Sequence, residues 1–174
     1  RNTIGGAISI VSKKPTGELG LDLKAGIGNY GSRSFVTHLN LPELGGFSMK
    51  IDALVENRDG LVHNTFPGSR DFAEIRKTAF KWTTLWRPTD NFSVVYALDS
   101  SREKPTSNYQ YITASDQPLA NRPTFVSLES GRTRTTRVGV PVLQSPQKSL
   151  GHSLTAEWDV SDNLTLRSIT AFRK

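Results

Sequence analysis

The segment F-S-M-K-I-D-A-L-V-E, residues 47–56, decides the fold of this chain. Its odd-numbered positions, from Phe47 to Val55, are apolar, whereas its even-numbered positions are nearly all polar or charged, as at Lys50 and Asp52. Successive side chains of a β-strand point to opposite faces of a sheet, so this period of two predicts a strand with one apolar and one wet face. The segment has ten residues. A tilted strand needs about 9–11 residues to cross a bilayer, so the segment is long enough to do so.

The same alternation recurs along the rest of the chain, and no helix of useful length is indicated. The sequence therefore predicts an all-β fold, an antiparallel amphipathic meander of about seven strands. The other predicted strands are 19–27, 33–41, 75–87, 92–99, 150–159 and 164–173.

The connections between these strands differ in length according to their order. The even-numbered ones, at 42–46, 88–91 and 161–163, are short, whereas two of the three odd-numbered ones, near 57–74 and 102–147, are long and the first, at 29–32, is a tight turn. Barrels of the outer membrane have short periplasmic turns and long extracellular loops, so this alternation favours a membrane-spanning meander with its short turns in the periplasm. Aromatic residues fit this orientation, because a girdle at the membrane interface is expected near the short turns. These aromatic residues are Phe47, Trp86, Phe92 and Trp158.

A soluble β-sandwich, for example a carbohydrate-binding module, is the alternative that this pattern leaves open. In a sandwich the apolar faces of two sheets pack on each other, whereas in a barrel they meet lipid. A nucleic-acid partner is not favoured, although the net charge is +6. The basic residues are concentrated in one loop and are not interleaved with stacking aromatics along a groove.

The opening residues R-N-T-I-G-G-A-I-S-I-V-S-K-K-P differ from the meander that follows. From the pattern alone they predict a short buried strand after a Gly-Gly turn, followed by a linker. The segment nevertheless resembles the closing motif of the plug domain of TonB-dependent outer-membrane receptors. The stretches L-D-L-K-A-G-I-G-N-Y-G-S-R-S and E-N-R-D-G-L-V likewise resemble the first barrel strands of that family.

This resemblance implies a domain division and a function. Residues 1–15 would be the C-terminal end of the plug, with the motif residues Arg1, Asn2, Gly5 and Gly6, residues 16–18 a linker, and 19–174 the first seven barrel strands. The family closes about 22 strands around a plug and takes up scarce ligands such as ferric siderophores. The resemblance thus implies an active transporter fragment in the outer membrane of a Gram-negative bacterium. Its partners would be outer-membrane lipid and lipopolysaccharide, an iron chelate, and the TonB complex acting through a plug segment outside this sequence.

The residues themselves give no sign of catalysis or of a cofactor. The chain has no cysteine, and its three histidines lack metal-ligand spacing. No nucleophile motif, phosphate-binding loop or closely spaced carboxylate pair is present. We therefore expect a protein that is not an enzyme and that needs no metal or cofactor.

The long connection 102–147 carries the candidate binding residues. Arginine and tyrosine side chains recognise carboxylates and catecholates through charge and hydrogen bonding, so we expect this loop to present a cationic, aromatic rim to an anionic ligand. The alternative is a solvated loop that also touches anionic lipopolysaccharide. The candidate ligand-binding residues are Arg132, Arg134, Arg137, Tyr109 and Tyr111.

Overall fold

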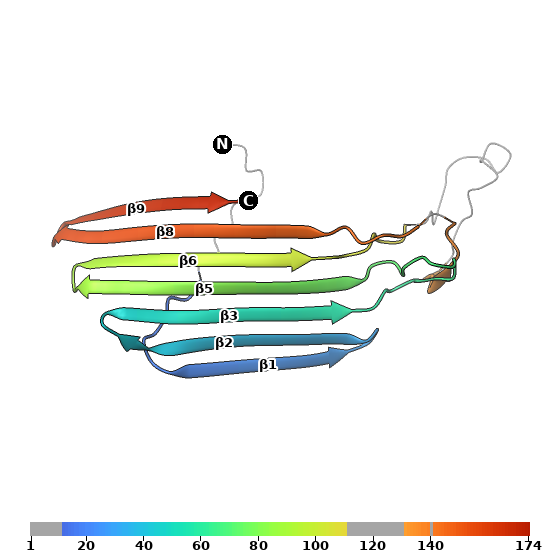
Figure 1. The fold of residues 1–174 in the computed structure, drawn as a ribbon, viewed down its shortest axis with the longest axis horizontal. Helices are drawn as coiled ribbons and strands as arrows, with labels where there is room; N and C mark the ends of the chain where they lie inside the picture. Colours follow the sequence, from blue (N-terminus) through green and yellow to red (C-terminus); the bar gives the residue numbers. More distant parts are fainter. Residues whose placement is uncertain (1–11, 111–130, 140) are drawn as a thin grey trace.

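The computed structural model describes residues 12–110, 131–139 and 141–174, and they form one layer of antiparallel strands (Figure 1). The sheet has seven strands in the order β1-β2-β3-β5-β6-β8-β9, so each strand pairs with its neighbours along the chain. The predicted all-β meander is therefore confirmed. The strands are β1 (Gly20–Gly28), β2 (Ser32–Leu44), β3 (Phe47–Arg58), β5 (Ile75–Thr89), β6 (Phe92–Glu103), β8 (Gln147–Ser161) and β9 (Leu164–Arg173).

The sheet has two distinct ends. The turns β2–β3, β5–β6 and β8–β9 lie at the left of Figure 1, which we call the short-turn end, and the two long connections lie at the right, which we call the long-connection end. Within the described chain the sheet is open, with β1 and β9 at its edges. No helix in this part of the chain is long and apolar enough to cross a membrane.

The strands extend further into the connections than the sequence predicts. β6 continues to Glu103, where Arg102 pairs with both Thr78 and Lys148, so the prediction that the loop begins at residue 102 is wrong by two residues. The apolar alternation fades after Leu98, but backbone pairing needs no apolar side chain and continues. The plug motif residues Arg1, Asn2, Gly5 and Gly6 lie outside the described residues, as does Tyr111.

The short turns are tighter than the sequence indicates. Leu44 pairs with Phe47 around Gly45 and Gly46, which have φ values of 59° and 78°. Positive φ at both central positions matches the hairpin turn whose twist suits antiparallel strands, and glycine adopts it without strain. The β5–β6 turn carries a register shift between Trp86 and Thr89, which accommodates a proline that cannot donate to the ladder.

The register preserves the two predicted faces across the whole sheet. Directly paired residues share a face, and one such row joins Leu39, Ile51, Trp82 and Leu98. The adjacent row of the opposite face consists mostly of ionisable side chains. Its members are Asp22, His38, Asp52, Lys81, Asp99, Gly151 and Arg173.

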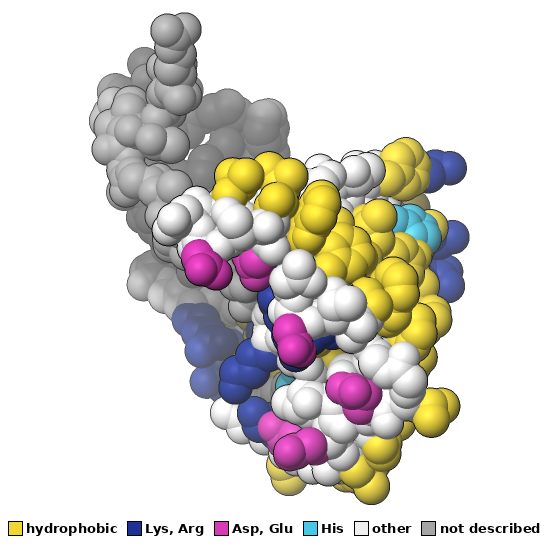
Figure 2. Space-filling model, turned by 90° about the vertical axis from the view of Figure 1, so that its left-hand side faces the viewer, with side chains coloured by type: hydrophobic (Ala, Val, Ile, Leu, Met, Phe, Trp, Pro, Cys, Tyr) yellow, Lys and Arg dark blue, Asp and Glu magenta, His cyan; other side chains and the backbone are white. Residues whose placement is uncertain are grey.

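The apolar face is uncovered. Phe35, Val55, Phe80 and Leu154 are 45%, 41%, 42% and 45% exposed, and hydrophobic side chains gather on the right-hand side of the sheet in Figure 2. The few buried apolar residues lie elsewhere, in the long connections or on the polar face, and no large side chain among the described residues is fully buried. Within the described chain this face therefore meets no second layer.

Aromatic side chains form a continuous belt across the apolar face at the short-turn end. The rings of Phe47 and Trp86 stack at 5.7 Å, and Trp86 meets Phe92 edge to face at 6.4 Å. Phe92 in turn pairs with Trp158 of β8. The residues that the sequence places near the short turns are thus brought side by side from four strands.

Ionisable side chains on the polar face pair both within a strand and across strands. Asp52 accepts a hydrogen bond from His38 at 2.6 Å and pairs with Lys50 at 3.0 Å. Asp99 reaches across Gly151 to Arg173, 3.0 Å away. A Cβ at residue 151 would lie 2.5 Å from the Asp99 carboxylate, so glycine makes this cross-strand contact possible.

Candidate ligand-binding rim

The two long connections pack against each other beyond the strand ends. Their contact includes a two-residue parallel ladder between β4 (His63–Asn64) and β7 (Thr135–Thr136). The His63 amide donates to the carbonyl of Arg134 at 2.9 Å, and the Thr65 amide donates to that of Thr136 at 2.8 Å. Residues 134–136 of the connection between β6 and β8 are therefore held by hydrogen bonds to the connection between β3 and β5.

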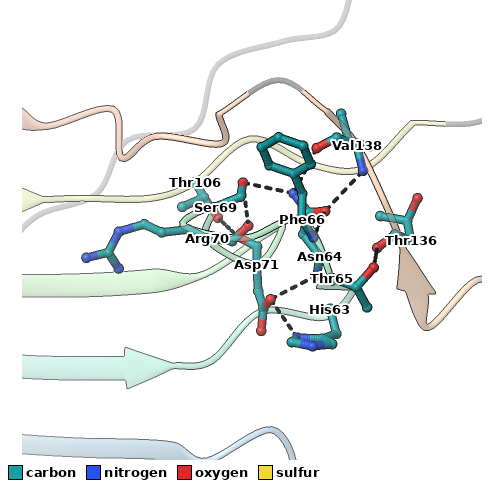
Figure 3. A network of polar contacts seen from close by, with 10 residues as sticks. All are labelled: His63, Asn64, Thr65, Phe66, Ser69, Arg70, Asp71, Thr106, Thr136 and Val138. Carbon is teal, nitrogen blue, oxygen red and sulfur yellow. Dashed lines mark hydrogen bonds and ion pairs between the residues drawn. The ribbon is translucent and has the colours of Figure 1, made fainter.

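Asn64 is the hub of this junction, which Figure 3 shows from close by. Asn64 is 4% exposed, and its Oδ1 accepts hydrogen bonds from the amides of Phe66 and Val138 at 3.2 and 3.0 Å. Its Nδ2 donates to Ser69 Oγ at 2.8 Å. Asn64 thus holds both connections through donor and acceptor groups at once.

A second set of polar contacts fixes residues 70–74, in the second half of the connection between β3 and β5 (Figure 3). Asp71 Oδ1 accepts hydrogen bonds from the Asn64 amide and His63 Nδ1, each at 2.9 Å. Buried Thr106 donates to the Asp71 carbonyl at 2.7 Å and accepts from the Glu74 amide at 2.9 Å. Arg70 pairs with the Glu74 carboxylate at 2.9 Å. The carboxylates of Asp71 and Glu74 therefore already have partners within this connection.

The structure separates the three predicted arginines. Arg132 Nη2 donates to the Tyr30 hydroxyl at 2.8 Å, and its guanidinium lies 5.9 Å from the centre of the Tyr30 ring. Arg132 therefore links the connection between β6 and β8 to the β1–β2 turn. Arg134 and Arg137 are exposed, and neither side chain has an ion-pair partner among the described residues. Within the part of the chain that the structure describes, these two cations are exposed and uncompensated.

Tyr109 has a packing role that the sequence does not indicate. Its ring meets buried Phe72 edge to face at 5.2 Å, and its hydroxyl accepts a hydrogen bond from Thr136 at 3.3 Å. These contacts join the first and last parts of the long connection to residues 59–74. Tyr109 supports the rim, whereas Arg134 and Arg137 are the parts of the prediction that face outward.

Sequence reasoning misses the residues that assemble the rim. Asn64 and Val138 are 74 positions apart, and Arg132 and Tyr30 are 102 apart. A two-residue ladder is too short to leave a periodic signal. The turn at Asn29 to Ser32 is predicted, but its tyrosine gives no sign that it receives an arginine.

The side chains at this candidate site are suited to recognition by charge. Within residues 12–110, 131–139 and 141–174 no group of His, Asp and Glu side chains could hold a metal ion. Guanidinium groups without carboxylate partners are suited to bind carboxylate, catecholate or phosphate groups. In a comparison with known proteins, no protein-family model, curated protein or solved structure matches this chain.

Replacing the hub should loosen both connections. Asn64→Ala removes the acceptor of the Phe66 and Val138 amides, and leaving buried groups unpaired costs about 1–3 kcal/mol. We expect these amides to exchange hydrogen at least about tenfold faster, as measured by exchange with mass spectrometry. The control is Asn108→Ala, at an exposed position of the neighbouring segment. Unchanged exchange in Asn64→Ala would contradict the role of Asn64 as hub.

Proposed function

We propose that this chain is part of a TonB-dependent outer-membrane transporter that takes up an anionic ligand, most simply a ferric siderophore. The observation that carries the proposal is the single-layer sheet, which is apolar and uncovered on one face and charged on the other. Such a sheet suits a wall between lipid and an aqueous lumen. We infer the family from the opening residues 1–15, which resemble the closing motif of the plug domain of TonB-dependent receptors.

The open edges support membership of a larger barrel. β1 and β9 each present an unpaired row of backbone groups on one side within the described chain. Unpaired backbone groups cannot remain in hydrocarbon, so a sheet of this kind needs further strands to close it. In this proposal those strands and the rest of the plug belong to the same protein.

The soluble sandwich is the second candidate function. It requires another sheet on the apolar face, and the only other sheet in the described residues is the two-stranded β4–β7 ladder at the rim. The exposed fractions of Leu23 and Phe172, 55% and 62%, favour a face that meets lipid. Transport, with no bond made or broken, is therefore the function we propose.

In this proposal the rim captures the ligand before it enters the lumen. Loops on a rigid scaffold are common binding sites, and the exposed Arg134 and Arg137 would steer a negatively charged chelate toward the pore. The contact between Arg132 and Tyr30 holds the segment of Arg134 and Arg137 near the β1–β2 turn. Arg132 is therefore a positioning residue, and Arg134 and Arg137 are the binding residues.

The test is ligand capture by the full-length transporter carrying Arg134→Ala and Arg137→Ala. At low ionic strength we expect the association rate constant for a ferric catecholate chelate to fall about tenfold, because steering by charge is then strongest. The difference should shrink at high salt. Stopped-flow quenching of tryptophan fluorescence measures the rate, and uptake of radioactive iron reports transport.

The matched control removes the same charge elsewhere. Lys24→Ala with Arg87→Ala changes two exposed cations on the polar face of β1 and β5. An association rate as low in this control as in the arginine variant would argue against a specific rim. Equal rates in wild type and the arginine variant at low salt would leave the loop without a binding role.

A further inference from the structure

The turn between β1 and β2 holds a bulky residue in a backbone conformation that favours glycine. Tyr30 and Gly31, its two central residues, have φ values of 60° and 62°. A hairpin turn with positive φ at both central positions usually has asparagine before glycine, and a large aromatic residue is strained there. Strained residues that the surrounding structure holds in place gather at functional sites. The turn therefore gives up stability at Tyr30.

Residues at the ends of β3 and β5 hold this turn in place. The Asp59 amide donates a hydrogen bond to the Tyr30 carbonyl at 2.8 Å. The Asp59 carboxylate lies so close to Gly31 that a Cβ there would collide with it, and it accepts a hydrogen bond from Arg76 Nη2 at 2.8 Å. Arg76 is fixed as well, because its Nη1 donates to the Arg58 carbonyl at 2.8 Å. These contacts hold the backbone of the turn and leave the Tyr30 side chain to another partner.

That partner is Arg132, in the connection between β6 and β8. The Tyr30 hydroxyl accepts its hydrogen bond, and the Tyr30 ring lies beneath the same guanidinium. A hydrogen bond and a cation–π contact together restrict a guanidinium more than either contact does alone. Asparagine, the usual residue at this place in the turn, has no ring to offer. Arg134 and Arg137 follow within five positions, so a fixed Arg132 limits where these two exposed cations can lie.

We propose that Tyr30 is a positioning residue of the ligand-binding rim, and that the turn tolerates its strained backbone because the phenol must lie beside Arg132. The phenol orders the segment of Arg134 and Arg137 before the ligand arrives. A segment that is already ordered loses less conformational entropy on binding than a free one.

Position and charge affect different rate constants. The charges of Arg134 and Arg137 act on the ligand at a distance and speed its capture, whereas the order that Tyr30 imposes slows its release. The inference rests on the proposed function, because it needs the rim to bind an anion. It adds a residue of the β1–β2 turn to the rim and states which step of binding that residue controls.

The test is the binding kinetics of a ferric catecholate chelate to the full-length protein carrying Tyr30→Asn, a change that suits the turn and leaves every charge in place. We expect the dissociation rate constant to rise about fivefold, because the segment must then be ordered during binding. The association rate constant should change by less than about twofold, because steering depends on charge. Tyr30→Phe keeps the ring and should give an intermediate dissociation rate. Stopped-flow fluorescence measures both rate constants.

Hydrogen exchange of the Ser32 amide tests the strain. This amide closes the turn by donating to the Asn29 carbonyl at 3.3 Å. In an Arg132→Ala background, where the phenol has lost its partner, Tyr30→Asn should slow this exchange about threefold, because it relieves the strained backbone. A tyrosine that merely supports the turn would give faster exchange on its removal, and that result would overturn the inference.

The control is Asn29→Ala, at an exposed position of the same turn. An equal rise in its dissociation rate would overturn the role of Tyr30, as would a Tyr30→Asn protein that releases the chelate as slowly as wild type. Either result would leave the proposed function intact. A wild-type protein that does not bind the chelate, or that binds it equally well without Arg134 and Arg137, would overturn the proposed function and this inference with it.

Discussion

Leu154→Arg should lower the free energy of unfolding of the full-length protein in a lipid bilayer by about 2–4 kcal/mol. Leu154 is 45% exposed on the apolar face, in the row of Met49 and Tyr96. In water, a charged group at so open a position would cost little. Toward the middle of a bilayer it loses its hydration, which is the source of the expected loss.

The preceding residue provides a control in the same strand. Ser153 lies on the polar face, in the row of Ala97 and Ala171, and Ser153→Arg should change stability by much less because its charge would remain in water. Reversible urea unfolding in vesicles, followed by tryptophan fluorescence, measures both variants. Equal losses at positions 153 and 154 would show that the two faces do not differ in the way a membrane wall requires.

The 174-residue chain expressed by itself should not form a stable monomer in aqueous buffer. Leu21, Leu23 and Ile27 on edge strand β1 are 63%, 55% and 94% exposed. Both outer strands also offer unpaired backbone to another copy. Exposed apolar strands with free edges associate, so we expect oligomers or precipitate by size-exclusion chromatography with light scattering.

Detergent provides the comparison for this experiment. Micelles cover the apolar face but leave the edges of β1 and β9 unpaired, so we expect detergent to reduce precipitation without giving a cooperatively melting monomer. A monodisperse monomer in buffer, with a single sharp thermal transition, would instead favour the soluble sandwich.

The sequence by itself determines the strands, their faces and the order in which they pair. Each strand is marked by a local period of two, and residues such as Gly45 and Gly46 mark a tight turn within a few positions. Strands joined by short turns pair with each other, so the register of β2 with β3 follows from the turn. The aromatic belt could be predicted for the same reason, because its members flank the short turns.

Only the tertiary structure decides how the long connections are held and which cations are available. Asn64, Tyr109 and Arg132 act on partners far away in sequence, and contacts of this kind leave no periodic pattern. The proximity of Arg102 to Lys148, which are 46 positions apart, likewise depends on the register of β6 with β8. Local patterns fix how a segment presents its faces, but the free energy of side-chain pairing depends on groups that only folding brings within a few ångströms.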